Sequence, residues 1–255
     1  MNNYERYLFD LQGFITVPDA LDAAQISELN RILDEHIAAD ITPETPTKRW
    51  GDLLSWDKAY RDLIDNSRIT PYLDEIIGKN FRLDHDYADL IRKGKGPIGT
   101  RLHGGSTPFD PSQFYHFQNG RFYNGLTVVA YNLCDVNLGD GGFGCVPGSH
   151  KSNYPFPDEW KELENFQPFM RAVTGPAGTA IIFTEALTHG TLPWHGAGER
   201  RTLFYKYSPF AVSWSARYYN ADNYEGLTEA QRAILEAPNA RYRGRDAHIS
   251  KVKYG

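Results

Sequence analysis

Cysteine, long apolar runs and clusters of positive charge are all scarce in this chain, and each scarcity argues against a class of protein. Two cysteines among 255 residues are too few for a disulfide framework. No apolar run reaches the 18 residues that indicate a membrane-spanning helix, and the opening MNNYERYLFD lacks the basic and apolar regions of a signal peptide. The net charge is -5 and no block of Lys and Arg stands out, so we expect neither nucleic acid nor a membrane as partner. We therefore expect a cytoplasmic protein.

The remaining composition is that of a globular domain. Hydrophobic residues make up 41% of the chain and charged residues 23%. A chain of this length has enough residues to bury a core, and barrels or sandwiches of similar size form one domain. We expect a single domain over residues 1–255.

The first 80 residues favour helices. Apolar residues recur at helical spacing over 22–39, and shorter helical patterns cover 57–65 and 70–77. Residues 13–17 resemble a strand that follows a short lead-in, and 41–50 resemble a loop. We call residues 1–80 the helical front.

From residue 81 onward the pattern changes to short strands separated by Gly, Pro and Asn. The clearest apolar runs cover 82–91, 125–136, 180–183 and 202–207, and a helix is predicted over 228–237. Many short strands behind a helical front predict an α+β fold, mainly β, with a double-stranded β-helix (jelly-roll, cupin-like) core. We assign this core to 81–212 and a tail to 213–255.

Residues 178–209 carry the strongest chemical signal. A buried strand is followed by His189, and a second strand begins at Arg200, eleven positions later. Neutral imidazole is a good ligand for iron, copper or zinc, and a guanidinium binds a carboxylate through two hydrogen bonds. The pattern predicts a metal site beside a carboxylate clamp.

Three segments resemble one known family. FDLQGFITVPDAL at 9–21, GGFGCVPGSHK at 141–151 and the 178–209 stretch are similar to the phytanoyl-CoA dioxygenase-like branch of the iron(II)/2-oxoglutarate oxygenases. The resemblance implies Fe(II) held by two histidines and one carboxylate, 2-oxoglutarate as co-substrate, and a small-molecule substrate. The family name does not indicate the substrate of this chain, because no Lys/Arg cluster suited to coenzyme A phosphates is present.

The resemblance assigns the metal ligands, with one departure. The first histidine and the carboxylate normally form His-x-Asp, which matches His103 in RLHGG, and His189 matches the second histidine. The carboxylate position is Gly105, which has no ligand atom. Either another carboxylate reaches the metal, with Asp86, Asp110 and Glu185 as candidates by type, or chloride or bromide fills the position as in related halogenases. In a third alternative, the site has lost its catalytic activity and only binds a ligand. In a fourth, the ligand segment is His116 with Gln118, although Gln is a poor iron ligand.

The resemblance also assigns the co-substrate site. Arg200 pairs with the far carboxylate of 2-oxoglutarate, unless Arg201 does, since neighbouring strand residues face opposite ways. Thr191 adds a hydroxyl to the same carboxylate, although it can also be an ordinary turn residue. Tyr131 is placed beside the co-substrate, and a plain core aromatic is an equally good interpretation of it. His150 in PGSHK is expected to shape a turn and not to bind metal.

The predicted function is therefore an Fe(II)/2-oxoglutarate-dependent oxygenase acting on a C–H bond of a small molecule. A halogenase is the first alternative and a cupin-like binding module without turnover is the second. A zinc or manganese isomerase or hydrolase is a further rival, against which the arginine pair argues. The sequence leaves the substrate and the oligomeric state open.

Overall fold

Two facing antiparallel sheets form the centre of the molecule. The structure is a computed structural model and describes residues 1–163 and 167–240. The large sheet has the order β1-β9-β6-β11-β3-β2 and the small sheet the order β10-β7-β8, while β4 and β5 pair as a separate hairpin. The strands are β1 (Phe14–Val17), β2 (Thr47–Gly51), β3 (Phe81–Ile91), β4 (Tyr115–Gln118), β5 (Arg121–Asn124), β6 (Thr127–Asn132), β7 (Gly142–Cys145), β8 (Arg171–Ala172), β9 (Ala180–Thr184), β10 (His189–Leu192) and β11 (Arg200–Pro209).

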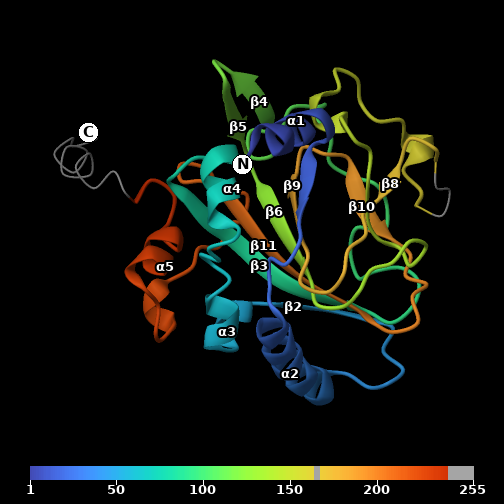
Figure 1. Cartoon of the computed structure of the whole chain (residues 1–255), viewed down its shortest axis with the longest axis vertical. Coiled ribbons are helices and arrows are strands. Elements are labelled where there is room, and N and C mark those ends of the chain that lie inside the picture. Colours follow the sequence, from blue (N-terminus) through green and yellow to red (C-terminus); the bar gives the residue numbers. More distant parts are fainter. Residues whose placement is uncertain (164–166, 241–255) are drawn as a thin grey trace, which may run out of the picture.

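Helices cover one face of the large sheet, and the small sheet lies on the other. Figure 1 shows α3 (Lys58–Arg61), α4 (Thr70–Ile76) and α5 (Glu229–Ile234) on one side, with β8 and β10 on the opposite side. All strand pairs within the sheets are antiparallel. The predicted double-stranded β-helix with flanking helices is confirmed.

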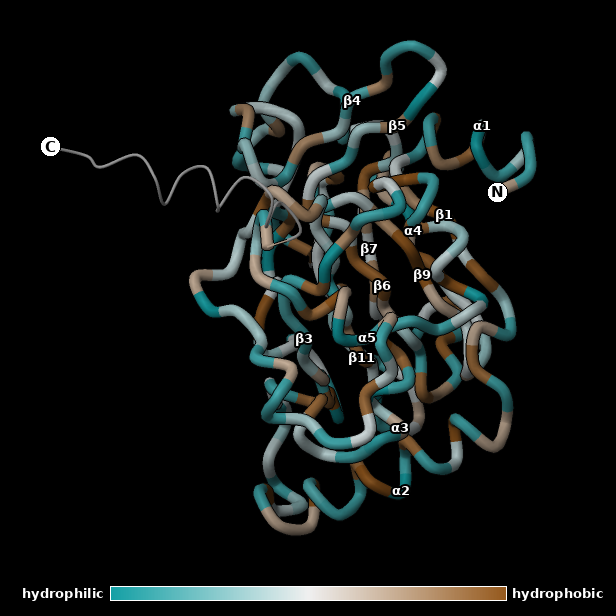
Figure 2. Tube along the Cα trace, turned by 90° about the vertical axis from the view of Figure 1, so that its left-hand side faces the viewer, coloured by the Kyte–Doolittle hydropathy of each residue, from teal (hydrophilic) through white to brown (hydrophobic). Residues whose placement is uncertain are grey.

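The alternation of β11 explains how the two faces differ. Leu203, Tyr205 and Tyr207 belong to the core beneath the helices, together with Leu29, Ile32 and Leu33 of α2 (Ala23–Asp40). Phe204 lies in the second core, between the sheets, with Phe143 and Phe183. Because successive strand residues point to opposite faces, the even-numbered residues of β11 face the small sheet. Figure 2 shows β6 and β9 as hydrophobic segments through the middle of the fold.

The predicted helices form, and one helix was not predicted. Asp22 caps α2 by accepting from the Gln25 backbone N–H, which explains the start of the helix at residue 23. The lead-in contains α1 (Asn3–Gln12), which begins with a capping box between Asn2 and Glu5. That box is visible in the sequence, so the signal for α1 was present.

The helical front also contributes to the large sheet. Its strand β1 pairs with β9, and β2 pairs with β3 where a loop was predicted over 41–50. The boundary at residue 80 therefore does not divide the sheet. The predicted tail is described as far as residue 240, and residues 241–255 lie outside the described residues. Within the described ranges, no helix combines the length and apolar character needed to cross a membrane.

Candidate metal and co-substrate site

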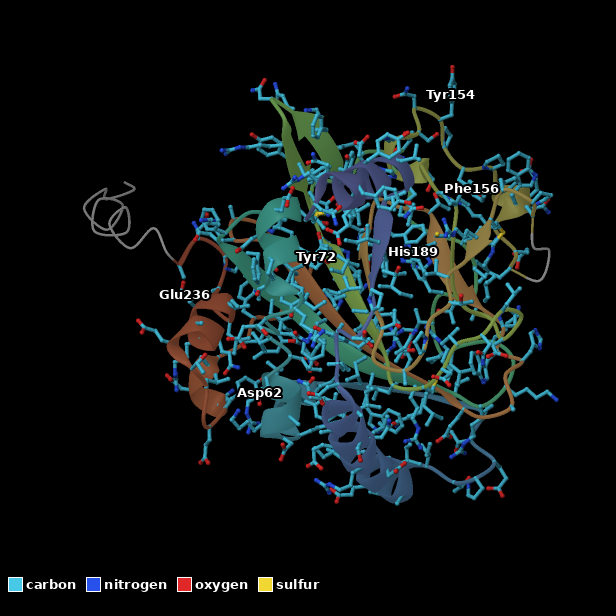
Figure 3. The ribbon with its side chains drawn as sticks, in the orientation of Figure 1. Asp62, Tyr72, Tyr154, Phe156, His189 and Glu236 are labelled. Carbon is cyan, nitrogen blue, oxygen red and sulfur yellow. The ribbon has the colours of Figure 1, made fainter. Side chains whose placement is uncertain are left out.

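The two predicted histidine ligands lie directly opposite each other. His189 is the first residue of β10, and the backbone N–H of each histidine donates to the carbonyl of the other at 2.9 Å. Their ring centroids are 4.3 Å apart. His189 is buried in the interior, whereas Tyr154 projects from the edge of the fold (Figure 3). His103 is exposed, so the pair has one side open to solvent.

Both rings are oriented to present Nε2. His103 Nδ1 lies 3.0 Å from the Arg101 carbonyl oxygen, and His189 Nδ1 lies 2.7 Å from that of Leu187. A carbonyl oxygen only accepts, so each Nδ1 carries the proton and each Nε2 keeps a lone pair. Hydrogen bonds of this kind fix the tautomer of metal-binding histidines. Burial lowers the pKa of His189 to about 3, which keeps that ring neutral.

Glu185 joins the histidines from the turn between β9 and β10. The ligand atoms of His103, Glu185 and His189 all lie within 4.8 Å of one another. Glu185 Oε2 is 3.7 Å from His189 Nε2, and Oε1 accepts from the Lys206 ammonium. Burial would raise the pKa of this carboxyl, but Lys206 and His189 hold the pKa at about 2. Glu185 is therefore a carboxylate, and these three residues form the candidate metal cluster.

The cluster lines a cavity of about 400 Å³ between the sheets. Its charged residues include two paired sets: Arg49 with Asp89, through two bonds of 2.6 Å, and Lys206 with Glu185. Aromatic walls come from Tyr87, Phe143, Phe204 and Trp214. Sequence reasoning missed most of this lining, although alternation from Arg200 along β11 would have identified Lys206.

Arg200 and Arg201 face opposite sides of the sheet, as strand alternation predicts. Its side chain lines the cavity and is 2% exposed, and its Nε and Nη1 have no hydrogen-bond partner among the described residues. Burial lowers the pKa of Arg200, and Asp89 opposes this shift. Arg201 instead binds Glu199 and, at 2.7 Å, Asp34 outside the cavity. Of these two arginines, Arg200 is the one whose guanidinium faces the cavity.

The structure places Thr191 in the cavity and Tyr131 outside it. Thr191 lines the cavity with the cluster. Tyr131 belongs to the helix-side core, where its ring packs against Tyr205 at a centroid distance of 6.0 Å. Because Tyr131 pairs with Leu203, whose side chain also faces the helices, its position beside a co-substrate is not supported. The core-aromatic interpretation describes it correctly.

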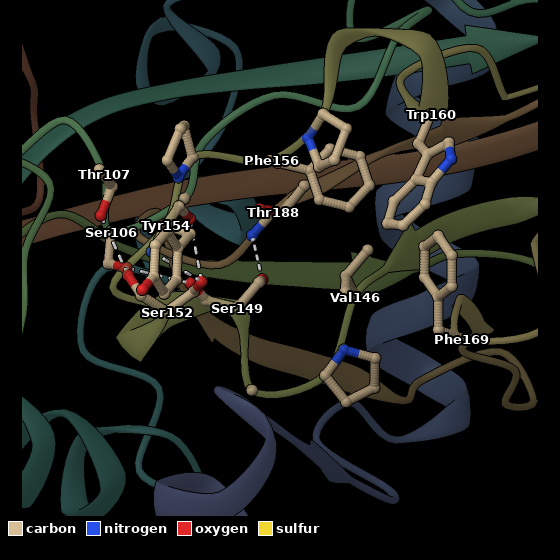
Figure 4. Close-up of a pocket in the computed structure, with 15 residues that line it drawn as sticks. Ser106, Thr107, Val146, Ser149, Ser152, Tyr154, Phe156, Trp160, Phe169 and Thr188 are labelled. Atoms are coloured by element: carbon tan, nitrogen blue, oxygen red, sulfur yellow. Dashed lines mark hydrogen bonds between the residues drawn. The ribbon is translucent and has the colours of Figure 1, made fainter.

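Gly105 lines a different cavity from the histidines. It borders a cleft of about 410 Å³ with Thr188. Figure 4 shows the hydroxyls of Ser106 and Ser152 at one end of this cleft and the rings of Phe156, Trp160 and Phe169 at the other. A Cβ on Gly105 would lie 3.2 Å from Thr188 Oγ1, so a side chain there would point toward this cleft.

The other sequence candidates lie away from the cluster. Asp86 faces the helices, where its carboxylate accepts from the Leu53 N–H and the Tyr219 hydroxyl, and burial raises its pKa to about 6. Asp110 accepts from Ser112 within its own loop. His116 is exposed on β4. His150 is buried and contacts the Asp10 carbonyl, in agreement with its predicted turn role.

Asp84 fixes the tail segment that carries Trp214, one of the residues lining the cavity. Its buried carboxylate accepts from the backbone N–H groups of Trp214 and Ser215, both at 2.9 Å, and from Arg82 at 3.0 Å. These bonds hold the Trp214 ring against His85 at a centroid distance of 5.0 Å. Burial would raise the pKa of Asp84, but His85 and the two backbone donors lower it to about 2.

Asp84→Asn is expected to lower the free energy of unfolding by about 2 kcal/mol at pH 7, because one pKa unit corresponds to about 1.4 kcal/mol. The folded pKa lies below the unfolded value, so this stability is complete above about pH 4 and is lost as the pH falls through about 2. Urea unfolding of both proteins at pH 7 and pH 3 measures the difference. Asp62→Asn, which removes an exposed pair with Lys58, is the control and should have little effect. A constant Asp84→Asn effect at both pH values would contradict the assignment.

The chain matches known proteins by sequence model and by fold. The family model described as Phytanoyl-CoA dioxygenase (PhyH) matches residues 9–202, which is more than half of the 255 residues. A comparison with curated protein sequences finds no match.

Two solved proteins illustrate the structural likeness. HygX from Streptomyces hygroscopicus, with nickel and 2-oxoglutarate bound, is 23% identical and has a TM-score of 0.77, covering 89% of this chain and 95% of its own. HygX with nickel, 2-oxoglutarate and hygromycin B bound is 22% identical with a TM-score of 0.71, over 84% and 89% of the two chains. SnoN, a non-heme alpha ketoglutarate dependent epimerase from nogalamycin biosynthesis, is 18% identical with a TM-score of 0.60, over 81% and 83%.

These identities are low enough that the likeness shows the fold alone. The family assignment rests on the sequence model. Its match runs from Phe9 in α1 to Thr202 in β11, and so includes both histidines and Arg200. The chain belongs to the phytanoyl-CoA dioxygenase (PhyH) family.

Proposed function

We propose that this protein is an Fe(II)/2-oxoglutarate-dependent oxygenase that hydroxylates or otherwise oxidises a C–H bond of a small molecule. One observation carries the proposal: two histidines with free Nε2 atoms share a cavity with a buried guanidinium that has unpaired donors. Two imidazoles and a carboxylate with open positions suit non-haem iron. A buried cation with free donors suits a carboxylate ligand.

The residues fit both groups. His103 and His189 would hold iron(II) through Nε2, and Arg200 would bind the far carboxylate of 2-oxoglutarate, with the Thr191 hydroxyl beside it. Of the cavity's cationic side chains, Arg49 and Lys206 already have carboxylate partners, which leaves Arg200 for the ligand. When bound, iron(II) and 2-oxoglutarate would supply the oxidation by dioxygen, since such chemistry belongs to the cofactor.

The chain's own part is binding, orientation and exclusion of water. Arg200 would hold one carboxylate of the co-substrate in the cavity that the two histidines also line. Tyr87, Phe204 and Trp214 form a largely apolar wall that would hold a substrate carbon near the metal and limit water access. HygX has been solved with hygromycin B bound, which supports a small-molecule substrate here.

A halogenase is the alternative, and its support is Gly105 at the usual carboxylate position. Against it, Gly105 borders the neighbouring cleft and is not among the described residues that line the metal cavity. We therefore rank oxidation without halide first. The binding-module alternative differs from both because it requires no turnover.

Succinate formation tests the proposal. The protein with iron(II), ascorbate and 2-oxoglutarate is expected to consume dioxygen and release succinate slowly even without substrate, since ascorbate can supply the two electrons that the substrate would otherwise provide. Addition of candidate small molecules should accelerate the reaction. Absence of succinate above the level of a His103→Ala/His189→Ala control, with all candidates tried, would support the binding module.

A further inference from the structure

We infer that Glu185 is the third protein ligand of the metal, so that the carboxylate reaches the ion from the turn before β10 and not from position 105. This inference rests on the proposed function and names a residue of that same site. It makes the site a complete set of two histidines and one carboxylate. It also removes the need for a halide at the usual carboxylate position.

The distances suit a shared ion. Ligand atoms that each lie about 2.1 Å from one metal ion are separated from each other by at most about 4.2 Å. Glu185 Oε2 and His189 Nε2 are 3.7 Å apart, and all three ligand atoms fall within 4.8 Å. A small shift of the exposed His103 side chain, with its Nδ1 still at the Arg101 carbonyl, would close the set.

The second oxygen of Glu185 has a separate partner. Oε1 accepts from Lys206, whose position on β11 faces the same cavity. Oε2 is thereby left directed toward His189. Metal-binding carboxylates are commonly held in this way by a hydrogen bond to the oxygen that does not bind the ion. Lys206 is therefore a positioning residue for Glu185.

The two glycines after His103 explain why the carboxylate ligand comes from the turn before β10 and not from position 105. A Cβ on Gly104 would lie 2.6 Å from the Leu187 carbonyl oxygen and 2.7 Å from that of Glu185. Gly104 also has φ of +77° and Gly105 has φ of +107°, conformations that favour glycine. The glycine pair thus lets the His103 segment pack directly on the turn that carries Glu185. A side chain at 105 would point to Thr188 and the other cleft.

Calorimetric titration with nickel(II), without co-substrate, tests the inference independently of activity. Because Glu185→Gln alone would leave Lys206 buried and unpaired, the key comparison is Lys206→Met against the double variant Glu185→Gln/Lys206→Met. These proteins differ only at residue 185. Lys206→Met is expected to retain nickel(II) binding, with a modest loss from the missing hydrogen bond, because Glu185 remains available to the ion. The double variant should bind at least about 100-fold more weakly.

Two further variants sharpen the result. Asp110→Asn removes another carboxylate that the sequence offered as a candidate ligand, and should leave the affinity unchanged. Gly105→Asp added to the double variant should not restore binding, because position 105 faces the neighbouring cleft. Cobalt(II) absorption spectra should change in the double variant and remain as in the wild type for Asp110→Asn.

The outcomes separate the inference from the proposed function. Nickel(II) binding by the double variant within about threefold of Lys206→Met, or restoration by Gly105→Asp, would overturn the role of Glu185 while leaving the oxygenase intact. Failure of the wild type to bind any divalent metal would overturn both. Weak binding confined to variants that lack Glu185 supports the inference.

Discussion

Replacing His189 with alanine is expected to weaken iron(II) binding at least about 100-fold and to reduce 2-oxoglutarate turnover to background. The ring presents Nε2 because its Nδ1 proton is held by the Leu187 carbonyl, and the rest of β10, Gly-Thr-Leu, contains no imidazole or carboxylate. Anaerobic iron(II) titration and succinate release measure the two effects.

Control variants separate metal loss from unfolding. His189 is buried, so its removal leaves a cavity and lowers stability. His103 is exposed, and His103→Ala should lose metal while the protein remains folded. His116→Ala, on the exposed hairpin, should behave as the wild type. Equal metal affinity in His103→Ala and His116→Ala would contradict the assignment of the histidine pair.

Arg200→Gln is expected to weaken 2-oxoglutarate binding by at least about 100-fold while leaving metal affinity nearly unchanged. Loss of one partner of a buried charged pair costs about 3 kcal/mol or more, and every 1.4 kcal/mol is tenfold in affinity. Arg200 is 2% exposed and two of its donor atoms have no partner in the described part of the chain. The substitution removes a buried charge and breaks no ion pair among residues 1–163 and 167–240.

Arg201→Gln is the matched control because it removes the same side chain one position away. Arg201 binds Asp34 and Glu199 on the outer face, so its loss should affect stability slightly and co-substrate binding not at all. Titration of 2-oxoglutarate into the nickel(II)-loaded proteins compares the two. A larger loss of affinity in Arg201→Gln than in Arg200→Gln would reverse the assignment.

Much of the site was predictable because it follows from local patterns. The apolar runs located β3, β6, β9 and β11, and Arg200 was expected at the start of a strand. His189 was expected in the segment after β9, and the structure makes it the first residue of β10, a strand that was not predicted. Strand alternation required Arg200 and Arg201 to face opposite sides, and the structure shows which of them faces the cavity.

The errors share one physical cause, which is that facing direction depends on strand register. Tyr131 and Asp86 both lie on central strands, and each faces the helices because it pairs with an odd-numbered residue of β11. Residue type alone could not separate Asp86 from Glu185 as a ligand candidate. That choice needed the turn before β10 and its contact with Gly104, which join segments some 80 residues apart.

The most direct test of the account is an anaerobic titration of iron(II) and 2-oxoglutarate into the wild-type protein, followed by the weak visible charge-transfer band of the chelate, with and without chloride. The account predicts a band that appears with both ligands, is lost in His103→Ala and is unaffected by chloride, because Glu185 completes the metal site. A band that shifts with chloride would contradict the role of Glu185 and would favour a halide as the third metal ligand. No band under any condition would contradict the oxygenase itself.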